Sequence, residues 1–167
     1  MTQMITQNIR PAGSWDKAID ICVMSYDERF LRRKVIQTKE GGTLLVDLAK
    51  VTSLDHGDGF ETTEGKIIEI RAAEEPLLAV TAPDLSRIAW HIGNRHTPCQ
   101  IEKDRLLIQR DHVMADMLAR IGAQVTEVVE PFTPEGGAYG HGRTHGHDHS
   151  HAHGPAETHV HGHTHGH

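Results

Sequence analysis

The chain has 167 residues, enough for one domain of ordinary size or two small ones and too few for a large multidomain assembly. Its 23 acidic residues outnumber its 17 basic ones, and the resulting net charge of −6 argues against a nucleic acid partner. No apolar run approaches the roughly 18 residues of a membrane span, residues 1–10 lack the apolar stretch of a secretory signal, and two cysteines suit a reducing compartment, so a cytoplasmic protein without a membrane partner is expected.

The first part of the chain, residues 1–75, is predicted to be a small all-β domain. Turn formers such as Gly41 and Gly42 separate apolar stretches that have the length of strands. The predicted strands cover residues 18–24, 30–38, 43–48 and 66–72. Adjacent apolar residues at 44–46 and 67–68 break simple alternation, which indicates strands covered on both faces and favours short sheets packed together.

Residues 76–138 are predicted to form an α+β domain. Apolar residues recur at helical spacing over 85–92, and Gly93 supplies the predicted stop because glycine adopts a left-handed backbone without steric cost. A second helix begins after the capping residue Asp111 and is closed by Gly122. Strands are predicted over 77–81, 99–102, 105–109 and 124–129. The resulting βαββαβ order is the ferredoxin-like arrangement.

Residues 139–167 form a histidine-rich tail that has too few large apolar residues to build a core, so it is expected to be disordered without ligand. Most of the chain's 15 histidines lie here and alternate with small residues. They are His141, His145, His147, His149, His151, His153, His159, His161, His163, His165 and His167. In an extended chain, residues two apart point to the same side, so these imidazoles can converge on Zn²⁺, Cu²⁺ or Ni²⁺. Spacing alone does not choose among these ions.

The histidines outside the tail each have an alternative to metal binding. His96 lies just past the predicted helix stop, where a lone exposed histidine is more often inert than a ligand. His112 follows the cap of the second helix and is expected to face solvent, while His56 sits in a turn. His91 and His96 are five residues apart, so one helix cannot bring them to the same ion. Cys99 is spaced to share a metal with His96, but a cysteine on a strand is usually a small buried hydrophobe.

A basic cluster and the lack of catalytic motifs complete the pattern. Arg29, Arg32, Arg33 and Lys34 could dock an acidic partner, or they could be a solvated strand face. The glycines at 59 and 65 resemble a phosphate loop but are spaced one residue too far apart, and no GxSxG nucleophile motif occurs. A metal-dependent hydrolase is an alternative that lacks an identifiable general base, so the protein is predicted not to be an enzyme.

Three segments together resemble the urease accessory protein UreE family. They are the Gly-Asn-Arg-His-Thr-Pro run at 93–98, the stretch at 111–118 that contains Asp-His-Val and Asp-Met-Leu, and Gly-Gly-Ala-Tyr at 136–139 before a histidine tail. The first segment is the specific signal, since a histidine tail alone would be weak. The resemblance implies an N-terminal β domain related to a chaperone peptide-binding fold and a ferredoxin-like second domain.

The same resemblance implies a nickel metallochaperone. His96 would be the principal ligand at a homodimer interface between the second domains, and His112 would match a position that binds additional metal. The implied partners are the urease accessory GTPase and the assembly complex of the urease apoprotein. Tail sites would collect Ni²⁺, with Zn²⁺ or Cu²⁺ also binding in vitro, and exchange between histidine ligands would carry it onward. A histidine-rich buffer or storage protein for Zn, Cu or Ni, without delivery, is the alternative.

Overall fold

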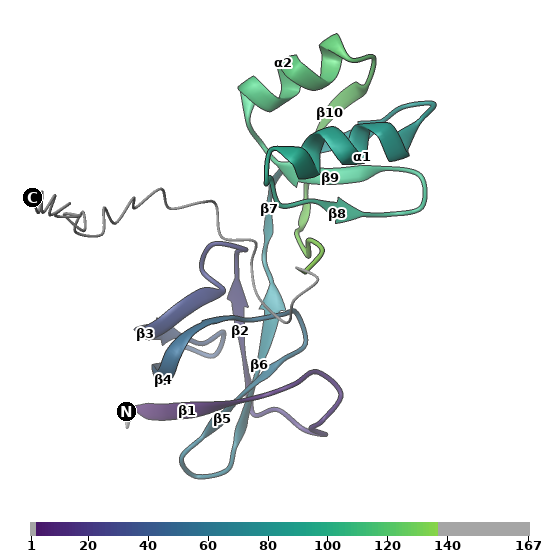
Figure 1. Cartoon of the computed structure of the whole chain (residues 1–167). Helices are drawn as coiled ribbons and strands as arrows, with labels where there is room; N and C mark the ends of the chain where they lie inside the picture. The colour runs from purple at the N-terminus through teal and green to yellow at the C-terminus, as the bar shows by residue number, and fades with distance from the viewer. Residues whose placement is uncertain (1–2, 137–167) are drawn as a thin grey trace, which may run out of the picture.

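The computed structural model describes residues 3–136, which form two sheets that lie one above the other (Figure 1). The first sheet has six strands in the order β2-β6-β5-β1-β4-β3. Its strands are β1 (Met4–Arg10), β2 (Asp20–Met24), β3 (Phe30–Gln37), β4 (Thr43–Ser53), β5 (Gly59–Thr62) and β6 (Ile67–Ala72). The pairs β1–β4 and β2–β6 are parallel, and the other neighbours are antiparallel.

The first sheet curls on itself, so the prediction of short sheets packed together is wrong. The main-chain N–H of Lys39, just after β3, donates to the carbonyl oxygen of Ile21 on β2 at 2.8 Å, although β2 and β3 are the two outermost strands. Phe60, Leu44 and Ile68 are fully buried inside the curl. A curled sheet encloses its core from several sides, as two packed sheets would, and the local sequence does not distinguish these arrangements.

The second sheet has four strands in the order β10-β7-β9-β8, with every neighbouring pair antiparallel. Its strands are β7 (Glu74–Thr81), β8 (Gln100–Ile101), β9 (Leu106–Gln109) and β10 (Gln124–Pro131), and its helices are α1 (Leu85–Asn94) and α2 (His112–Arg120). The chain order β7-α1-β8-β9-α2-β10 agrees with the predicted order. Both helices pack on one face of this sheet, around Leu78, Val80 and Ile108.

The helices begin where the sequence predicts, but α1 does not end there. The Asp84 carboxylate accepts from the Arg87 N–H at 3.2 Å, and the Asp111 carboxylate accepts from the Val113 N–H at 2.8 Å, so both aspartates cap their helices. Gly122 follows α2 with a left-handed φ of 92°. The prediction that Gly93 stops α1 is wrong, because Gly93 lies within the helix.

A joint of three side chains links the two sheets. The guanidinium of Arg29 donates to the carbonyl oxygens of Met24, Leu54 and Phe132. The Tyr26 and Phe132 rings meet edge to face with centroids 5.4 Å apart, and Phe132 is fully buried against the face of the second sheet away from its helices. Arg29 is only 2% exposed. It therefore does not belong to a solvated basic face, and the predicted cluster is reduced to Arg32, Arg33 and Lys34.

The remaining sequence expectations concern two strands, the domain boundary, membrane-spanning helices and the tail. The strands β1 and β5 were not predicted, and the division at residue 75 stays a prediction, although the chain passes from the first sheet to the second between Ala72 and Glu74. No helix within residues 3–136 is long and apolar enough to cross a membrane. The predicted disordered tail at 139–167 lies outside the described residues.

Candidate metal site

His96 lies at the end of α1, in a turn whose geometry is defined by main-chain hydrogen bonds. Its N–H donates to the Gly93 carbonyl oxygen at 2.9 Å, and the Thr97 N–H donates to the Ile92 carbonyl oxygen at 3.4 Å. This pair of bonds is the Schellman motif, which normally places a glycine where the backbone turns left-handed. Here the left-handed residue is His96, with a φ of 56°. Its imidazole is therefore carried by a fixed helix end rather than by an irregular loop.

The surroundings of His96 suit a cation. Its side chain is exposed, and it follows the last turn of α1, where the aligned peptide dipoles leave a partial negative charge that the neighbouring cation Arg95 partly offsets. Opposite charge at a helix C-terminus contributes about 0.3–1 kcal/mol when the site is exposed. The position combines a nitrogen ligand with a favourable local field.

Cys99, three residues after His96, is a poor metal ligand in this environment. The side chain is partly buried against the apolar cluster beneath the helices, and its Sγ donates to the carbonyl oxygen of Gln100 at 3.9 Å. Burial, with a smaller effect of the nearby Glu135 carboxylate, raises the pKa of the Cys99 thiol to about 11. Because the thiolate is the form that binds metals, the thiol would first have to lose a strongly held proton.

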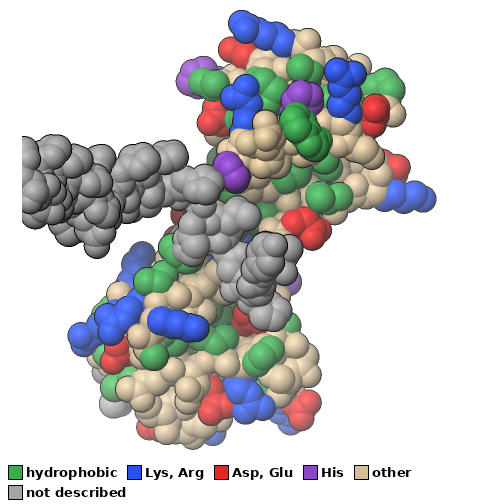
Figure 2. Space-filling view, viewed as in Figure 1, with side chains coloured by type: hydrophobic (Ala, Val, Ile, Leu, Met, Phe, Trp, Pro, Cys, Tyr) green, Lys and Arg blue, Asp and Glu red, His purple; other side chains and the backbone are tan. Residues whose placement is uncertain are grey.

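The other histidines of the described chain lie apart from His96 in different settings. His112 is the first residue of α2 and is exposed, as predicted. The His91 ring packs edge-on against Trp90 with centroids 5.0 Å apart, and His56 Nδ1 accepts the N–H of Ala72 at 3.0 Å. Figure 2 shows histidine side chains at separate points of the surface. Within residues 3–136, no three His, Cys, Asp or Glu side chains are grouped closely enough to hold a metal ion.

The chain that leads to the histidine tail is held beside the His96 turn. The N–H of Thr133 donates to the Gln100 side-chain oxygen at 2.8 Å, and the N–H of Glu135 donates to the Cys99 carbonyl oxygen at 2.9 Å. Sequence reasoning missed this attachment, and the only signal for it was the apolar Phe132 between two prolines. The predicted ligands of the tail, from His141 to His167, lie outside the described residues.

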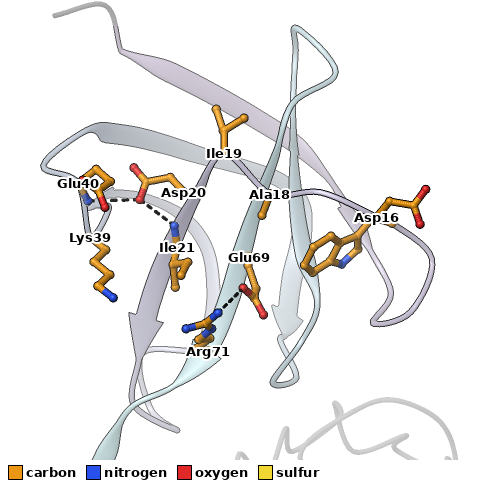
Figure 3. A pocket seen from close by; sticks show the side chains of 10 residues that line it. Asp16, Ala18, Ile19, Asp20, Ile21, Lys39, Glu40, Glu69 and Arg71 are labelled. Atoms are coloured by element: carbon orange, nitrogen blue, oxygen red, sulfur yellow. Dashed lines mark hydrogen bonds and ion pairs between the residues drawn. The ribbon is translucent and has the colours of Figure 1, made fainter.

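A shallow pocket of about 380 Å³ opens on the first sheet, beside β2 and β6, and no histidine lines it (Figure 3). Two of its charged residues pair with each other, since Arg71 lies 3.0 Å from the Glu69 carboxylate. Burial alone would raise the pKa of the Asp20 carboxyl. Hydrogen bonds from the Thr38 hydroxyl and two main-chain N–H groups together outweigh burial, so the pKa lies below its usual value. The pocket is separate from the candidate metal ligands.

Comparison with known proteins gives a consistent result over the whole chain. Residues 1–73 match the family described as UreE urease accessory protein, N-terminal domain, and residues 66–167 match UreE urease accessory protein, C-terminal domain. A protein of Ruegeria pomeroyi named urease accessory protein UreE is 65% identical over 138 residues, which cover 83% of this chain and 93% of the relative. Relatives of the same name from Cereibacter sphaeroides and Rhodobacter capsulatus are 59% and 54% identical, over 79% and 81% of this chain and 72% and 86% of theirs.

Proposed function

The chain belongs to the UreE family of urease accessory proteins, and from this premise we propose that it carries Ni²⁺ as cargo and delivers it for assembly of the urease active site. The observation that carries the proposal is the position of His96. A histidine replaces the usual glycine at a left-handed helix end, which exposes an imidazole beside the negative end of α1.

One imidazole is too few for a stable site, so the proposal includes a homodimer formed by the second domain. A two-fold axis beside His96 would supply the same ligand from the partner subunit without any further sequence feature. Large exposed apolar side chains on both helices support a protein contact on this part of the molecule: Trp90 on α1 is 63% exposed, and Val113 on α2 is 58% exposed.

A further set of histidines is proposed as weaker sites that collect the ion. His112 and the tail histidines from His141 to His167 would bind Ni²⁺, and also Zn²⁺ or Cu²⁺ in vitro, since imidazole accepts all three. The attachment of Glu135 to Cys99 supports transfer from the tail to His96, because it starts the tail close to that turn. A site of imidazoles lacks the closed thiolate shell of structural zinc, so it can release its ion.

The proposal extends to partners, compartment and fold class. Release would occur on contact with the urease accessory GTPase and the complex that holds the urease apoprotein, in the cytoplasm and without any catalytic step by this chain. The βαββαβ order and the strand order β10-β7-β9-β8 support a ferredoxin-like second domain over 76–138, following an N-terminal domain over 1–75. The alternative is a metal buffer without delivery, which the abundance of tail histidines favours.

Titration calorimetry with Ni²⁺ on three forms tests this proposal: the intact chain, a chain truncated after Tyr139, and that truncated chain with His96→Ala. The truncated chain should retain one tight ion per dimer, and His96→Ala should abolish that event, because it removes both proposed ligands of the site. The matched control is His91→Ala, which deletes a histidine within α1 and should leave the tight event unchanged. Loss of all binding on truncation alone would favour the buffer instead.

A further inference from the structure

The strand β3 presents an open edge on the first sheet. It is the last strand of the sheet and pairs with β4 alone over Phe30–Gln37, because the Lys39 bond that closes the sheet onto β2 comes after its last residue. A strand on a covered sheet buries every second side chain. On β3, however, four consecutive residues from Arg32 to Val35 are exposed, so both of its faces are open to solvent at this edge.

The open edge is strongly basic although the chain as a whole is acidic. Arg32, Arg33 and Lys34 follow one another on β3. Between Leu31 and Arg33 the register shifts: Leu31 pairs with Thr52, but Arg33 pairs with Asp47, so β4 bulges out between these two pairs. The bulge contains the exposed Lys50, which lies beside the basic residues of β3. Figure 2 shows Lys and Arg side chains gathered over β3 and β4. Asp47 on β4 is a counter-charge to this cluster, with its Oδ1 3.9 Å from Arg33 Nε.

An apolar row crosses the outer face of the same part of the sheet. Ile5 on β1 is paired with Leu45 on β4, and Leu45 is paired with Val35 on β3, so the three side chains point to one face. Their neighbours Leu44 and Val46 point the other way and are fully buried. Ile5 is 37% and Val35 is 52% exposed. Basic residues on an edge strand can serve only to prevent aggregation. That role would not account for the exposed aliphatic side chains beside them.

We propose that the open edge of β3 docks an extended acidic segment of another protein, which adds to the sheet as a further strand. Its main chain would bond to the free edge, its acidic side chains would meet Arg32, Arg33 and Lys34 on both faces, and an aliphatic side chain would extend the row that ends at Val35. A second copy of β3 is a poor occupant, because antiparallel pairing would bring like charges together. The surface is separate from the His96 turn, so this proposal does not depend on nickel binding.

Fluorescence anisotropy on the full-length apo protein in EDTA tests the docking. The probe is a labelled peptide of about ten residues in which two glutamates are followed by one valine in a repeating pattern, so that both faces of the added strand carry acidic side chains. Binding is expected at micromolar peptide and should weaken as salt rises. The double variant Arg33→Glu with Lys34→Glu should weaken it by at least about tenfold, since attraction becomes repulsion. The matched control, Lys66→Glu with Lys103→Glu, makes the same change of net charge at exposed positions elsewhere and should alter affinity by less than about twofold.

A second peptide separates strand addition from simple charge attraction. Replacing its valines by proline keeps every glutamate but removes the main-chain N–H groups of those positions, so it should bind at least about tenfold more weakly. Equal binding of the two peptides, equal loss in both double variants, or no binding of the first peptide would each overturn the proposal. Circular dichroism and the nickel titration on the same variants check folding and cargo binding independently, so a failure of one proposal is distinguishable from a failure of the other.

Discussion

His96 occupies a backbone position at which a side chain is unfavourable. A left-handed conformation costs roughly 1–2 kcal/mol for a residue with a Cβ, although histidine adopts it more often than most. The two Schellman hydrogen bonds, which the N–H groups of His96 and Thr97 donate, require this conformation at His96. The cost is therefore present in the folded protein whether or not a metal is bound. Strain of this kind is common at functional sites, where a ligand must point in one direction.

This geometry predicts that glycine is better than alanine for stability at position 96. The variant His96→Gly should have a free energy of unfolding about 1 kcal/mol higher than His96→Ala, because glycine adopts a φ of 56° without a clash. Urea denaturation in EDTA measures the difference.

A companion variant, Gly93→Ala, checks the same helix end. Gly93 lies within α1 without a left-handed φ, and nothing lies within 4 Å of a Cβ added there. Alanine should therefore stabilise the helix by about 0.5–1 kcal/mol. Destabilisation by Gly93→Ala would instead mean that α1 ends at Gly93.

The helices were largely predictable, because their signals are local. Apolar periodicity and the capping aspartates Asp84 and Asp111 lie within each helix or next to it. The end of α1 was misread because a glycine near a helix end predicts a stop, whereas here the left-handed residue is a histidine three positions later. The strand β1 was missed because only Thr6 in it is buried, and it forms by pairing with β4 and β5, which lie far along the chain.

Arg105, beside the β8–β9 turn, is bound to β10 by an ion pair. Its Nη1 and Nη2 donate to the two carboxylate oxygens of Glu130 at 2.8 and 2.6 Å, and its Nε donates to Glu102 at 3.1 Å. Since β7 separates β9 from β10 in the sheet, the pair ties together strands that are not neighbours. The hydrogen bonds from Arg105 hold the pKa of the Glu130 carboxyl below its usual value.

The lowered pKa gives a stability contribution with a definite pH dependence. It is present above the pKa of an unfolded glutamate, about 4.3, and is lost as the pH falls through the lower pKa of the folded protein. The variant Glu130→Gln should therefore unfold at lower urea concentration than the parent at pH 7, and the gap should close as the pH falls below about 4. The control is Glu127→Gln on the same strand, whose partner Arg110 is 3.9 Å away, and its gap should be smaller at every pH. A gap for Glu130→Gln that does not change with pH would contradict the assigned ion pair.

The two sheets act as one structure through the joint of Tyr26, Arg29 and Phe132. Arg29 and Phe132 are separated by 103 positions in the chain, and neither carries a local signal of the contact. Arg29 was grouped with the basic residues that follow it, because sequence cannot tell a buried guanidinium bonded to carbonyl oxygens from a solvated one. The candidate site was predictable only in part. The sequence motif points to His96, which stays a proposed ligand, whereas the attachment of the tail beside it depends on contacts between distant residues.

Replacing Arg29 should weaken this joint strongly. The variant Arg29→Met keeps most of the side-chain volume but leaves the carbonyl groups of Met24, Leu54 and Phe132 without these donors, which should cost about 2–4 kcal/mol of unfolding free energy. The nearby exposed Arg32→Met should cost less than about 0.5 kcal/mol. Chemical denaturation of both variants measures the contrast, and similar small losses would show that the joint contributes little.

The hydrogen bond from the Glu135 N–H to the Cys99 carbonyl oxygen also fixes the point from which the histidine tail starts. An extended chain advances at most about 3.6 Å per residue, so the Cα of His141, six residues on, stays within about 22 Å of that of Glu135. For His167 the same limit is about 115 Å. The greatest possible reach therefore rises with position along the chain, so the tail histidines proposed to collect the ion differ in how far from the helix end they could take it up.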